Sequence, residues 1–313
     1  MSECDLDTAA PEWVIEHPET LALFQELGID YCCGGKSLGY ACRERGLDTT
    51  WVLSRIRRCI KVADSGPSSG NSPVLASVQV GLPRQLGQAD AMDPMDRPWT
   101  TGFFKEPVLE PVRLGMTNVA GDGQADLVHH GGRDKAVLAY SADHYGDWRK
   151  DLNNPALPFG AFGENFTIQG LTEADVCVGD IWKIGDMATV QVSQPRQPCW
   201  KLARRWRIKT LALQVQRNGR TGWYFRVIAE GIVVGGMPLV LLERPHPQWS
   251  VARANRVMHM EQDDLRSAAE LAAIPPLAAS WRTTLVRRAE QNIHPDSDKR
   301  LNGEVVISPP KTA

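Results

Sequence analysis

The chain changes character within the stretch Asp64-Ser65-Gly66-Pro67-Ser68-Ser69-Gly70-Asn71-Ser72-Pro73-Val74-Leu75-Ala76-Ser77-Val78-Gln79-Val80. Residues 64–73 offer no apolar side chain for a core, and their glycine, serine and proline content predicts a linker. Residues 74–80 are rich in valine and predict a β-strand. The sequence therefore divides into a segment before this linker and a longer segment after it.

Short runs rich in valine and isoleucine continue beyond this first strand, separated by Gly-Asp, Asn-Gly and Gly-Gly turns. Many short strands at this spacing favour a closed or nearly closed β-barrel, which we place at residues 74–243. Helices are expected to interrupt it at 141–152 and 199–207. The predicted strands are residues 74–80, 135–140, 165–169, 180–184, 188–193, 224–228 and 239–242.

Helical patterns flank the barrel segment on both sides, so the expected fold class is α+β and multidomain. Residues 1–63 predict a small helical domain, in which Ser37 and either Asp48 or Thr49 are candidate helix caps. Residues 244–291 predict three helices that form a small bundle or pack against the barrel. The polar tail, residues 292–313, is expected to be disordered. The predicted helices are residues 18–27, 37–45, 48–63, 250–258, 263–273 and 276–291.

The composition has no strong excess of either charge. The 313 residues are 42% hydrophobic and 23% charged, and the formal net charge is -2. General nucleic-acid binding usually needs a basic excess, so no nucleic-acid partner is expected. No apolar run approaches the roughly 18 residues of a membrane helix, and residues 1–5 are unlike a signal peptide. We therefore expect a cytoplasmic protein without a membrane partner.

The cysteines are expected to be reduced thiols with separate roles. Their number is odd, no secretory signal precedes them, and no C-x-x-C pair of a closed structural zinc site occurs. They are Cys4, Cys32, Cys33, Cys42, Cys59, Cys177 and Cys199.

The chemical centre of the sequence is Gln194-Pro195-Arg196-Gln197-Pro198-Cys199-Trp200-Lys201. Cys199 follows a proline and is predicted to open a helix, whose dipole and nearby cations would lower the pKa of the thiol. A thiolate among cations suits a soft or high-valent metal, or nucleophilic sulfur chemistry. The alternative is a cysteine buried as a small hydrophobe, with the basic residues on a solvated face.

Two glycine-rich clusters precede predicted strands. The first, residues 126–137, contains His129, His130, Arg133 and Lys135 around two glycines. Glycines let backbone amides approach a ligand closely, and the cations can contact a phosphate. The second, residues 159–166, includes Asn165. Each cluster alone also fits an ordinary surface turn.

Together these motifs resemble the MOSC domain, which is named after the C-terminal domain of molybdenum cofactor sulfurases. The resemblance rests on residues 130–137, 163–166, 178–180 and 194–199, and it covers residues from about 74 to 290. It is closest to the stand-alone bacterial YiiM type, which adds a three-helix domain after the barrel.

The MOSC resemblance implies a β-barrel that binds molybdenum cofactor (molybdopterin), with Cys199 as the ligand to molybdenum. It implies that Arg133, Lys135, Asn165 and Arg196 belong to the cofactor pocket, and no pyridoxal phosphate is expected. The implied activity is reduction of N-hydroxylated bases or amines, such as 6-hydroxylaminopurine, a detoxification reaction.

The chemistry of that reaction sets further requirements. Reduction of R–NHOH to R–NH2 and water takes two electrons and two protons, and no ordinary side chain supplies the electrons. His129 or His130 suits the role of proton donor by its usual pKa. The sequence shows neither a Rossmann-type fingerprint nor a set of iron–sulfur cysteines. An electron-donating redox protein is therefore the expected partner.

The run Tyr31-Cys32-Cys33-Gly34-Gly35 resembles the N-terminal domain of the repair-of-iron-centres (ScdA-like) family. That domain precedes a hemerythrin-like di-iron bundle in the family, but His17 is the only histidine before residue 129 here. The resemblance therefore implies only that Cys32 and Cys33 form an exposed pair able to bind iron, nitric oxide or a partner. The alternative is that both thiols simply pack in a core.

Three functions remain open from the sequence. The first is a molybdoenzyme that reduces N-hydroxylated compounds. The second is a non-catalytic carrier of cofactor or sulfur that uses Cys199. The third is a thiol-based module, led by Cys32 and Cys33, that responds to metals or nitric oxide.

Overall fold

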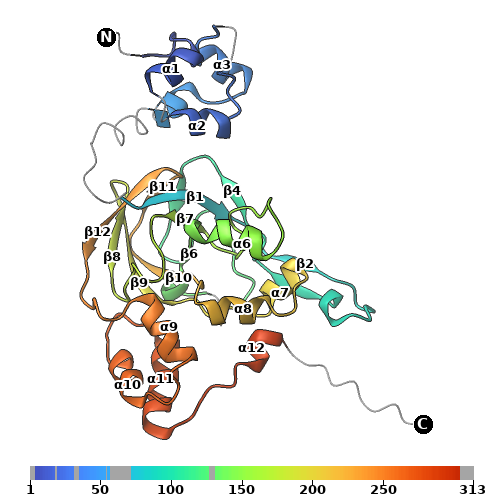
Figure 1. The fold of residues 1–313 in the computed structure, drawn as a ribbon, viewed down its shortest axis with the longest axis vertical. Helices are drawn as coiled ribbons and strands as arrows, with labels where there is room; N and C mark the ends of the chain where they lie inside the picture. Colours follow the sequence, from blue (N-terminus) through green and yellow to red (C-terminus); the bar gives the residue numbers. More distant parts are fainter. Residues whose placement is uncertain are drawn as a thin grey trace. The chain divides into compact units, whose positions relative to one another are not determined.

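The computed structural model describes residues 4–17, 20–31, 35–53, 55–56, 72–126 and 131–303. The chain divides into two compact units, Met1–Asn71 and Ser72–Ala313 (Figure 1). Each unit has its own hydrophobic core, so each is described by itself.

The first unit is helical, as the sequence predicts. It contains α1 (Ala10–Glu16), α2 (Leu21–Glu26) and α3 (Leu38–Glu44), followed by a further helical turn after Asp48. The expected cap at Ser37 forms, since its hydroxyl accepts from the Tyr40 amide, and of the two candidates for the next cap it is the Asp48 carboxylate that accepts from the Trp51 amide, at 2.7 Å. Cys32 and Cys33 lie outside the described residues. The buried side chains that make the core include Trp13, Phe24, Leu38, Cys42, Val52 and Ile56.

The second unit is built on a closed barrel. Its strands are joined in the order β12, β8, β9, β10, β6, β7, β1, and pairing of β1 with β12 closes the ring. Neighbours run antiparallel except β6 and β7, which are parallel. All predicted strands are confirmed, with ends moved by one or two residues. The bounds are β1 Val74–Val80, β6 Val137–Ser141, β7 Phe166–Gln169, β8 Ile181–Ile184, β9 Ala188–Pro195, β10 Trp223–Ala229 and β12 Met237–Glu243.

Alternation of side chains along the strands fills the barrel interior. On β6, Val137 and Ala139 belong to the barrel core, whereas Tyr140 points the other way into a second apolar cluster. That cluster includes Trp148 of α6 (Tyr145–Asp151) and Phe162, whose ring stacks on Tyr140 at a centroid distance of 4.5 Å. Because both faces of β6 are covered, all its side chains are buried.

Short elements connect the barrel strands. Two small antiparallel pairs form, β2 with β3 and β5 with β11, and β4 adds to the edge of β1. The helix expected at 199–207 is shorter and begins after Trp200, while α8 was not predicted. The bounds are β2 Arg84–Leu86, β3 Trp99–Thr101, β4 Glu106–Val108, β5 Val112–Leu114, β11 Gly231–Val233, α7 Lys201–Trp206 and α8 Leu211–Asn218.

Three helices follow the barrel, α9 (Val251–His259), α10 (Leu265–Ala272) and α11 (Ala279–Gln291). They share an apolar core and also bond to the barrel, so both expected arrangements occur together. The Val251 amide donates to the Val176 carbonyl at 2.7 Å, and the Ala278 amide donates to the Ser193 carbonyl at 2.9 Å.

The expectation of a disordered tail from residue 292 is wrong for the described part of that tail. Residues 298–302 form α12 (Asp298–Asn302), and Leu301 is buried in the cluster that contains α8. The sequence is polar overall, but burial of Leu301 and the hydrogen bonds from Arg300 to the Pro198 carbonyl and to Gln216 hold the segment against the barrel unit.

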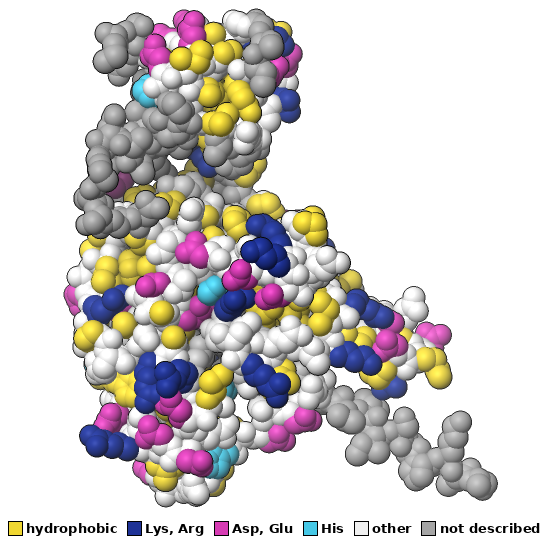
Figure 2. Space-filling model, in the orientation of Figure 1, with side chains coloured by type: hydrophobic (Ala, Val, Ile, Leu, Met, Phe, Trp, Pro, Cys, Tyr) yellow, Lys and Arg dark blue, Asp and Glu magenta, His cyan; other side chains and the backbone are white. Residues whose placement is uncertain are grey.

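Basic and acidic side chains are interspersed over the face of the molecule that Figure 2 presents, in agreement with the small net charge. Within the described residues, no helix is long and apolar enough to cross a membrane.

The glycine turn before β7 generates a prediction about stability. Gly163 has φ +81°, and a Cβ there would lie 2.8 Å from the ring of Phe103. Gly219 has φ +76° with open space around its Cβ position. Gly219→Ala should cost about 1 kcal/mol through backbone strain alone. Gly163→Ala should cost about 2–4 kcal/mol because overpacking adds to the strain. Urea unfolding of both variants measures the difference, and equal losses would contradict the packing argument.

A buried histidine generates a prediction about pH. Burial, followed by the charges of Arg300 and Arg288, lowers the pKa of His259 to about 3. The unfolded chain, with an ordinary histidine pKa, binds a proton that the folded chain does not, so stability falls as pH falls from about 6.5 toward 3. Between pH 7 and 5 this group should cost about 2 kcal/mol of unfolding free energy.

His259→Phe should remove that part of the acid sensitivity, as measured by urea unfolding at both pH values. His294 is exposed, and His294→Phe is the control that should keep the wild-type difference. An unchanged pH dependence in His259→Phe would show that the ring is protonated in the folded state.

Candidate functional site

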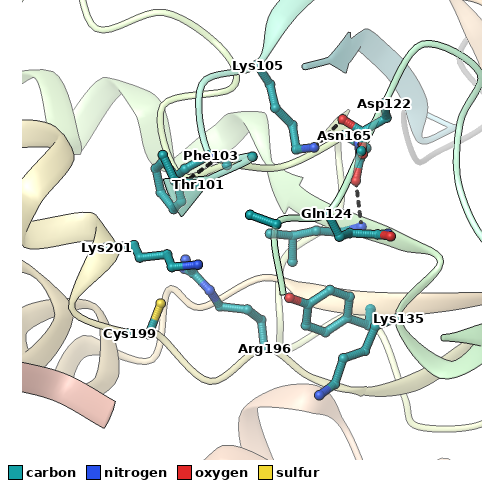
Figure 3. Close-up of a pocket in the computed structure, with 16 residues that line it drawn as sticks. Thr101, Phe103, Lys105, Asp122, Gln124, Lys135, Asn165, Arg196, Cys199 and Lys201 are labelled. Atoms are coloured by element: carbon teal, nitrogen blue, oxygen red, sulfur yellow. Dashed lines mark hydrogen bonds and ion pairs between the residues drawn. The ribbon is translucent and has the colours of Figure 1, made fainter. Parts of the chain in front are cut away.

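The side chain of Cys199 lies at a pocket formed where several barrel strands end (Figure 3). It sits in the turn between β9 and α7, one residue before the Trp200 cap of that helix, and is 8% exposed. Pro195 ends β9, and Pro198 precedes the cysteine. Because proline has no amide hydrogen and disfavours helical backbone angles in the residue before it, this turn is not helical. The lining residues are Thr101, Gly102, Phe103, Lys105, Asp122, Gly123, Gln124, Ala125, Lys135, Leu138, Gly163, Asn165, Arg196, Cys199, Lys201 and Tyr224.

Arg196 is a buried cation with unused hydrogen-bonding capacity beside Cys199. The residue is 4% exposed, and its Nη2 donates to the Phe162 carbonyl at 3.3 Å. Its Nη1 is fully buried and has no hydrogen-bond partner. Leaving a buried charged donor unpaired costs free energy, so such a group is typically found where a ligand completes it. Figure 3 shows Arg196, Cys199 and Lys201 gathered on one side of the pocket.

A buried ion pair forms the opposite side of the pocket. The Lys105 ammonium bonds to the Asp122 carboxylate, which also accepts from the Gly81 amide and from Asn165 Nδ2, both at 2.9 Å. Burial lowers the pKa of Lys105, and the charge of Asp122 opposes this shift. Because Asp122 neutralises Lys105, Arg196 is the stronger attraction for an anion.

Asn165 is committed to holding strands together. Its Nδ2 also donates to the Gln79 carbonyl, and its Oδ1 accepts from the Leu138 amide at 3.2 Å. The neighbouring Glu164 is fully buried and accepts from the amides of Gly160 and Phe162. The sequence Gly-Glu-Asn therefore fixes the turn that presents the Phe162 carbonyl to Arg196.

Tyr224, on β10, lines the pocket near Cys199. Burial, opposed by Arg196 and assisted by Cys199, raises the pKa of Tyr224 to about 12. The hydroxyl therefore stays protonated at neutral pH and can donate a hydrogen bond into the pocket.

The pocket opens into a wider groove that shares Cys199, Lys135, Lys201 and Tyr224 with it. The inner part has a volume of about 80 Å³, whereas the groove has about 1330 Å³, more than an ordinary small-molecule site requires. The charged side chains that line the groove are mainly basic. The basic residues that line it are Arg97, Lys135, Lys201, Arg204, Lys209, Lys299 and Arg300, and the acidic ones are Asp93, Asp126 and Asp296.

An aromatic wall and the C-terminal segment complete this groove. Trp99 of β3 and Trp200 lie with ring centroids 5.6 Å apart, and the Arg204 guanidinium lies 4.7 Å from the Trp200 ring centre. Arg300 of α12 donates to the Pro198 carbonyl, one residue before Cys199, and to Gln216. The C-terminal segment thus contributes directly to the surroundings of the thiol.

The structure brings together four of the candidate site residues: Lys135, Asn165, Arg196 and Cys199 line one pocket. Arg133 lies exposed on the 3-10 helix Arg133–Lys135 and is not among the lining residues. His129 and His130 lie outside the described residues. Burial lowers the pKa of Lys135, while Asp134 and Asp126 oppose the shift.

Several lining residues were not singled out from the sequence, namely Lys105, Asp122, Tyr224 and Arg300. Lys105 and Asp122 lie in connections without a motif, and only the closed barrel brings them to Asn165. Tyr224 belongs to a predicted strand, but the sequence pattern did not specify to which face of the sheet its side chain points. Arg300 lies in a polar tail whose order depends on tertiary contacts.

Comparisons with known proteins agree with both resemblances noted in the sequence. Residues 7–59 match the ScdA_N domain of unknown function (DUF542), residues 126–240 match the MOSC domain, and residues 249–291 match the YiiM-like 3-alpha helix domain. The protein YflK of Bacillus subtilis is 43% identical over 210 residues, which are 67% of this chain and 94% of YflK.

Two further relatives cover the same region. The crystal structure of YiiM from Geobacillus stearothermophilus has a TM-score of 0.58 at 39% identity, and the match covers 69% of this chain and 99% of that one. A protein of Gibberella moniliformis named "Reductase" is 39% identical over 180 residues, 56% of this chain. The match spans 32% of that protein's length.

The Lys105–Asp122 pair generates a prediction. Asp122→Asn should destabilise the protein by about 3–5 kcal/mol, because the buried Lys105 ammonium loses its counter-charge. The double variant Asp122→Asn with Lys105→Met should recover part of this loss, as measured by urea unfolding. Glu230→Gln breaks an exposed pair with Arg113 and is the control that should change stability far less. Additive losses in the double variant would refute coupling between Lys105 and Asp122.

Proposed function

This chain belongs to the MOSC family, in its YiiM-like branch, and from that premise we propose that it is a cytoplasmic molybdenum-cofactor-dependent reductase of N-hydroxylated bases or amines. The observation that carries the proposal is the buried, unpartnered Nη1 of Arg196 in the same pocket as the Cys199 thiol. A relative named "Reductase" supports the reaction class, and the substrate class follows from the family resemblance.

The residues around the groove fit a molybdopterin group. A thiolate is a soft ligand suited to the metal, and Cys199 offers its sulfur at the junction of the inner pocket and the groove. The anionic phosphate of the pterin requires cations, and Arg196 and Arg300 have no carboxylate partner among the described residues. The groove also has sufficient volume for the bicyclic pterin and a substrate base.

The bound cofactor would supply the two electrons that the side chains cannot provide, after receiving them from a partner protein. The remaining tasks fall to the chain itself. Cys199 would hold the metal, and Arg196 would bind negative charge with Nη1 while the Phe162 carbonyl fixes the orientation of its guanidinium. The pocket walls exclude bulk water from these groups, which strengthens their electrostatic interactions.

Proton delivery is the second task. Cleavage of the N–O bond releases hydroxide, which needs one proton to leave as water, and the amine nitrogen needs the other. Tyr224 lines the same pocket as Cys199, and its hydroxyl, protonated at neutral pH, would donate a hydrogen bond to a substrate oxygen bound there. His129 and His130 stay predicted proton donors. Their cluster begins at Asp126, which lines the groove.

The experiment that tests this function compares three proteins in the anaerobic reduction of 6-hydroxylaminopurine by reduced viologen. Protein made in a cofactor-competent host should contain about one molybdenum per chain. Cys199→Ser should lose turnover by at least 100-fold, because a hydroxyl is a hard and weakly acidic ligand in place of a thiolate. Cys177→Ser replaces another buried cysteine outside the pocket and should retain turnover.

Undiminished turnover in Cys199→Ser, or wild-type protein without molybdenum, would refute the proposed function. The double variant Cys32→Ser, Cys33→Ser should keep its turnover with the artificial donor, since those thiols belong to the other unit of the chain. Loss in that variant would place the first unit on the electron path.

A further inference from the structure

The first unit places three different metal-ligating side chains together, away from the Cys32–Cys33 pair in sequence. Cys4 Sγ, a carboxylate oxygen of Glu16 and a ring nitrogen of His17 all lie within 4.8 Å of one another. The thiol already contacts Glu16 Oε2 at 3.3 Å. Ligands of a tetrahedral zinc ion lie roughly 3.3–3.6 Å apart, given metal–ligand bonds of about 2.0–2.3 Å. Small side-chain rotations therefore suffice to bring the three atoms around one ion.

The backbone that carries these ligands is held from both sides. Cys4 begins an arm whose Asp5 carboxylate accepts from the amides of Asp7 and Thr8, and whose Asp5 carbonyl accepts from the Trp13 indole at 3.1 Å. Glu16 and His17 end α1, where the His17 amide donates to the Trp13 carbonyl and the Thr20 hydroxyl donates to the His17 carbonyl at 2.7 Å. Trp13 thus joins the arm to the end of the helix, so the backbone that carries the three ligands is held in place and only their side chains need to rotate.

The electrostatic environment of the thiol favours a cation. The Cys4 thiol donates to the Glu16 carboxylate, and the carboxylates of Glu12 and Asp5 add further negative charge around it. Each of these carboxylates disfavours a bare thiolate, and each would be compensated by a divalent cation bound to the sulfur. The thiol proton would pass to solvent as the metal–sulfur bond forms.

We propose that Cys4, Glu16 and His17 form a binding site for one zinc ion in the first unit. Mixed sulfur, nitrogen and oxygen ligation suits zinc, which accepts all three ligand types in tetrahedral geometry. Cys4 is nearly buried whereas Glu16 is exposed, so the fourth position faces solvent and takes water or an exchangeable ligand. This site is independent of the molybdenum cofactor and of Cys199.

Cobalt titration of the full-length chain tests the site, because thiolate-bound Co²⁺ absorbs strongly in the near ultraviolet. The background carries Cys32→Ser, Cys33→Ser and Cys199→Ser, so that these thiols cannot give the signal. One Co²⁺ per chain should bind with the thiolate band, and Zn²⁺ should displace it. Adding Cys4→Ser should abolish the band, and Glu16→Gln or His17→Gln should each weaken binding at least tenfold.

Cys42→Ser is the matched control, since it removes a buried cysteine of the same unit and should leave the band unchanged. Glu16→Gln alters an exposed side chain, so its effect on binding does not depend on a change in folding. Absence of the band in the background protein, its persistence in Cys4→Ser, or equal loss in Cys4→Ser and Cys42→Ser would overturn the proposal.

Discussion

Closure of the barrel by pairing of β1 with β12 is the constraint on which the site depends. β1 pairs with β7 and β12 along its two edges and also carries β4, so the first strand of the second unit links its early and late strands. That closure brings together three residues from distant parts of the sequence, namely Lys105 before β4, Asn165 before β7 and Cys199 after β9. Without it, these residues would not line one pocket. The hydrogen bonds from Asn165 to Gln79 and Asp122 then join the end of β1 and the loop beyond β5 to the residue that precedes β7.

The polar groups at this mouth divide into two kinds. Lys105, Asp122, Asn165 and Glu164 satisfy one another or nearby amides, so they stabilise the walls. Arg196 and Cys199 are buried without such complete pairing. A protein tolerates this cost where binding a ligand compensates it, so the unpaired Nη1 of Arg196, rather than the larger buried network, marks the part of the pocket suited to an anion.

Much of the architecture was predictable because its determinants are local. Alternating valines, glycine turns and caps such as Ser37 and Asp48 act over a few residues, and the predicted strands were found within two residues of their observed ends. The site was predictable only where a motif carried it, as at Cys199 and Arg196. The Lys105–Asp122 pair joins segments with no local pattern, and the order of α12 depends on Leu301 packing near α8. Arg133 and Lys135 are two residues apart, yet only Lys135 lines the pocket, because sequence spacing does not specify direction within a 3-10 turn.

α12 lines the groove without adding a strand to the barrel, so the groove is built from two structurally different parts of the unit. Substitutions in the barrel must preserve strand pairing, whereas residues 296–303 lie beyond the three matched domains and line the groove from outside the barrel. Variation in this short segment can reshape the entrance beside Cys199 without disturbing a single barrel hydrogen bond. A change of charge or size in α12 therefore acts on the entrance of the groove through Arg300 and the carbonyl before Cys199, while every strand of the barrel keeps its neighbours.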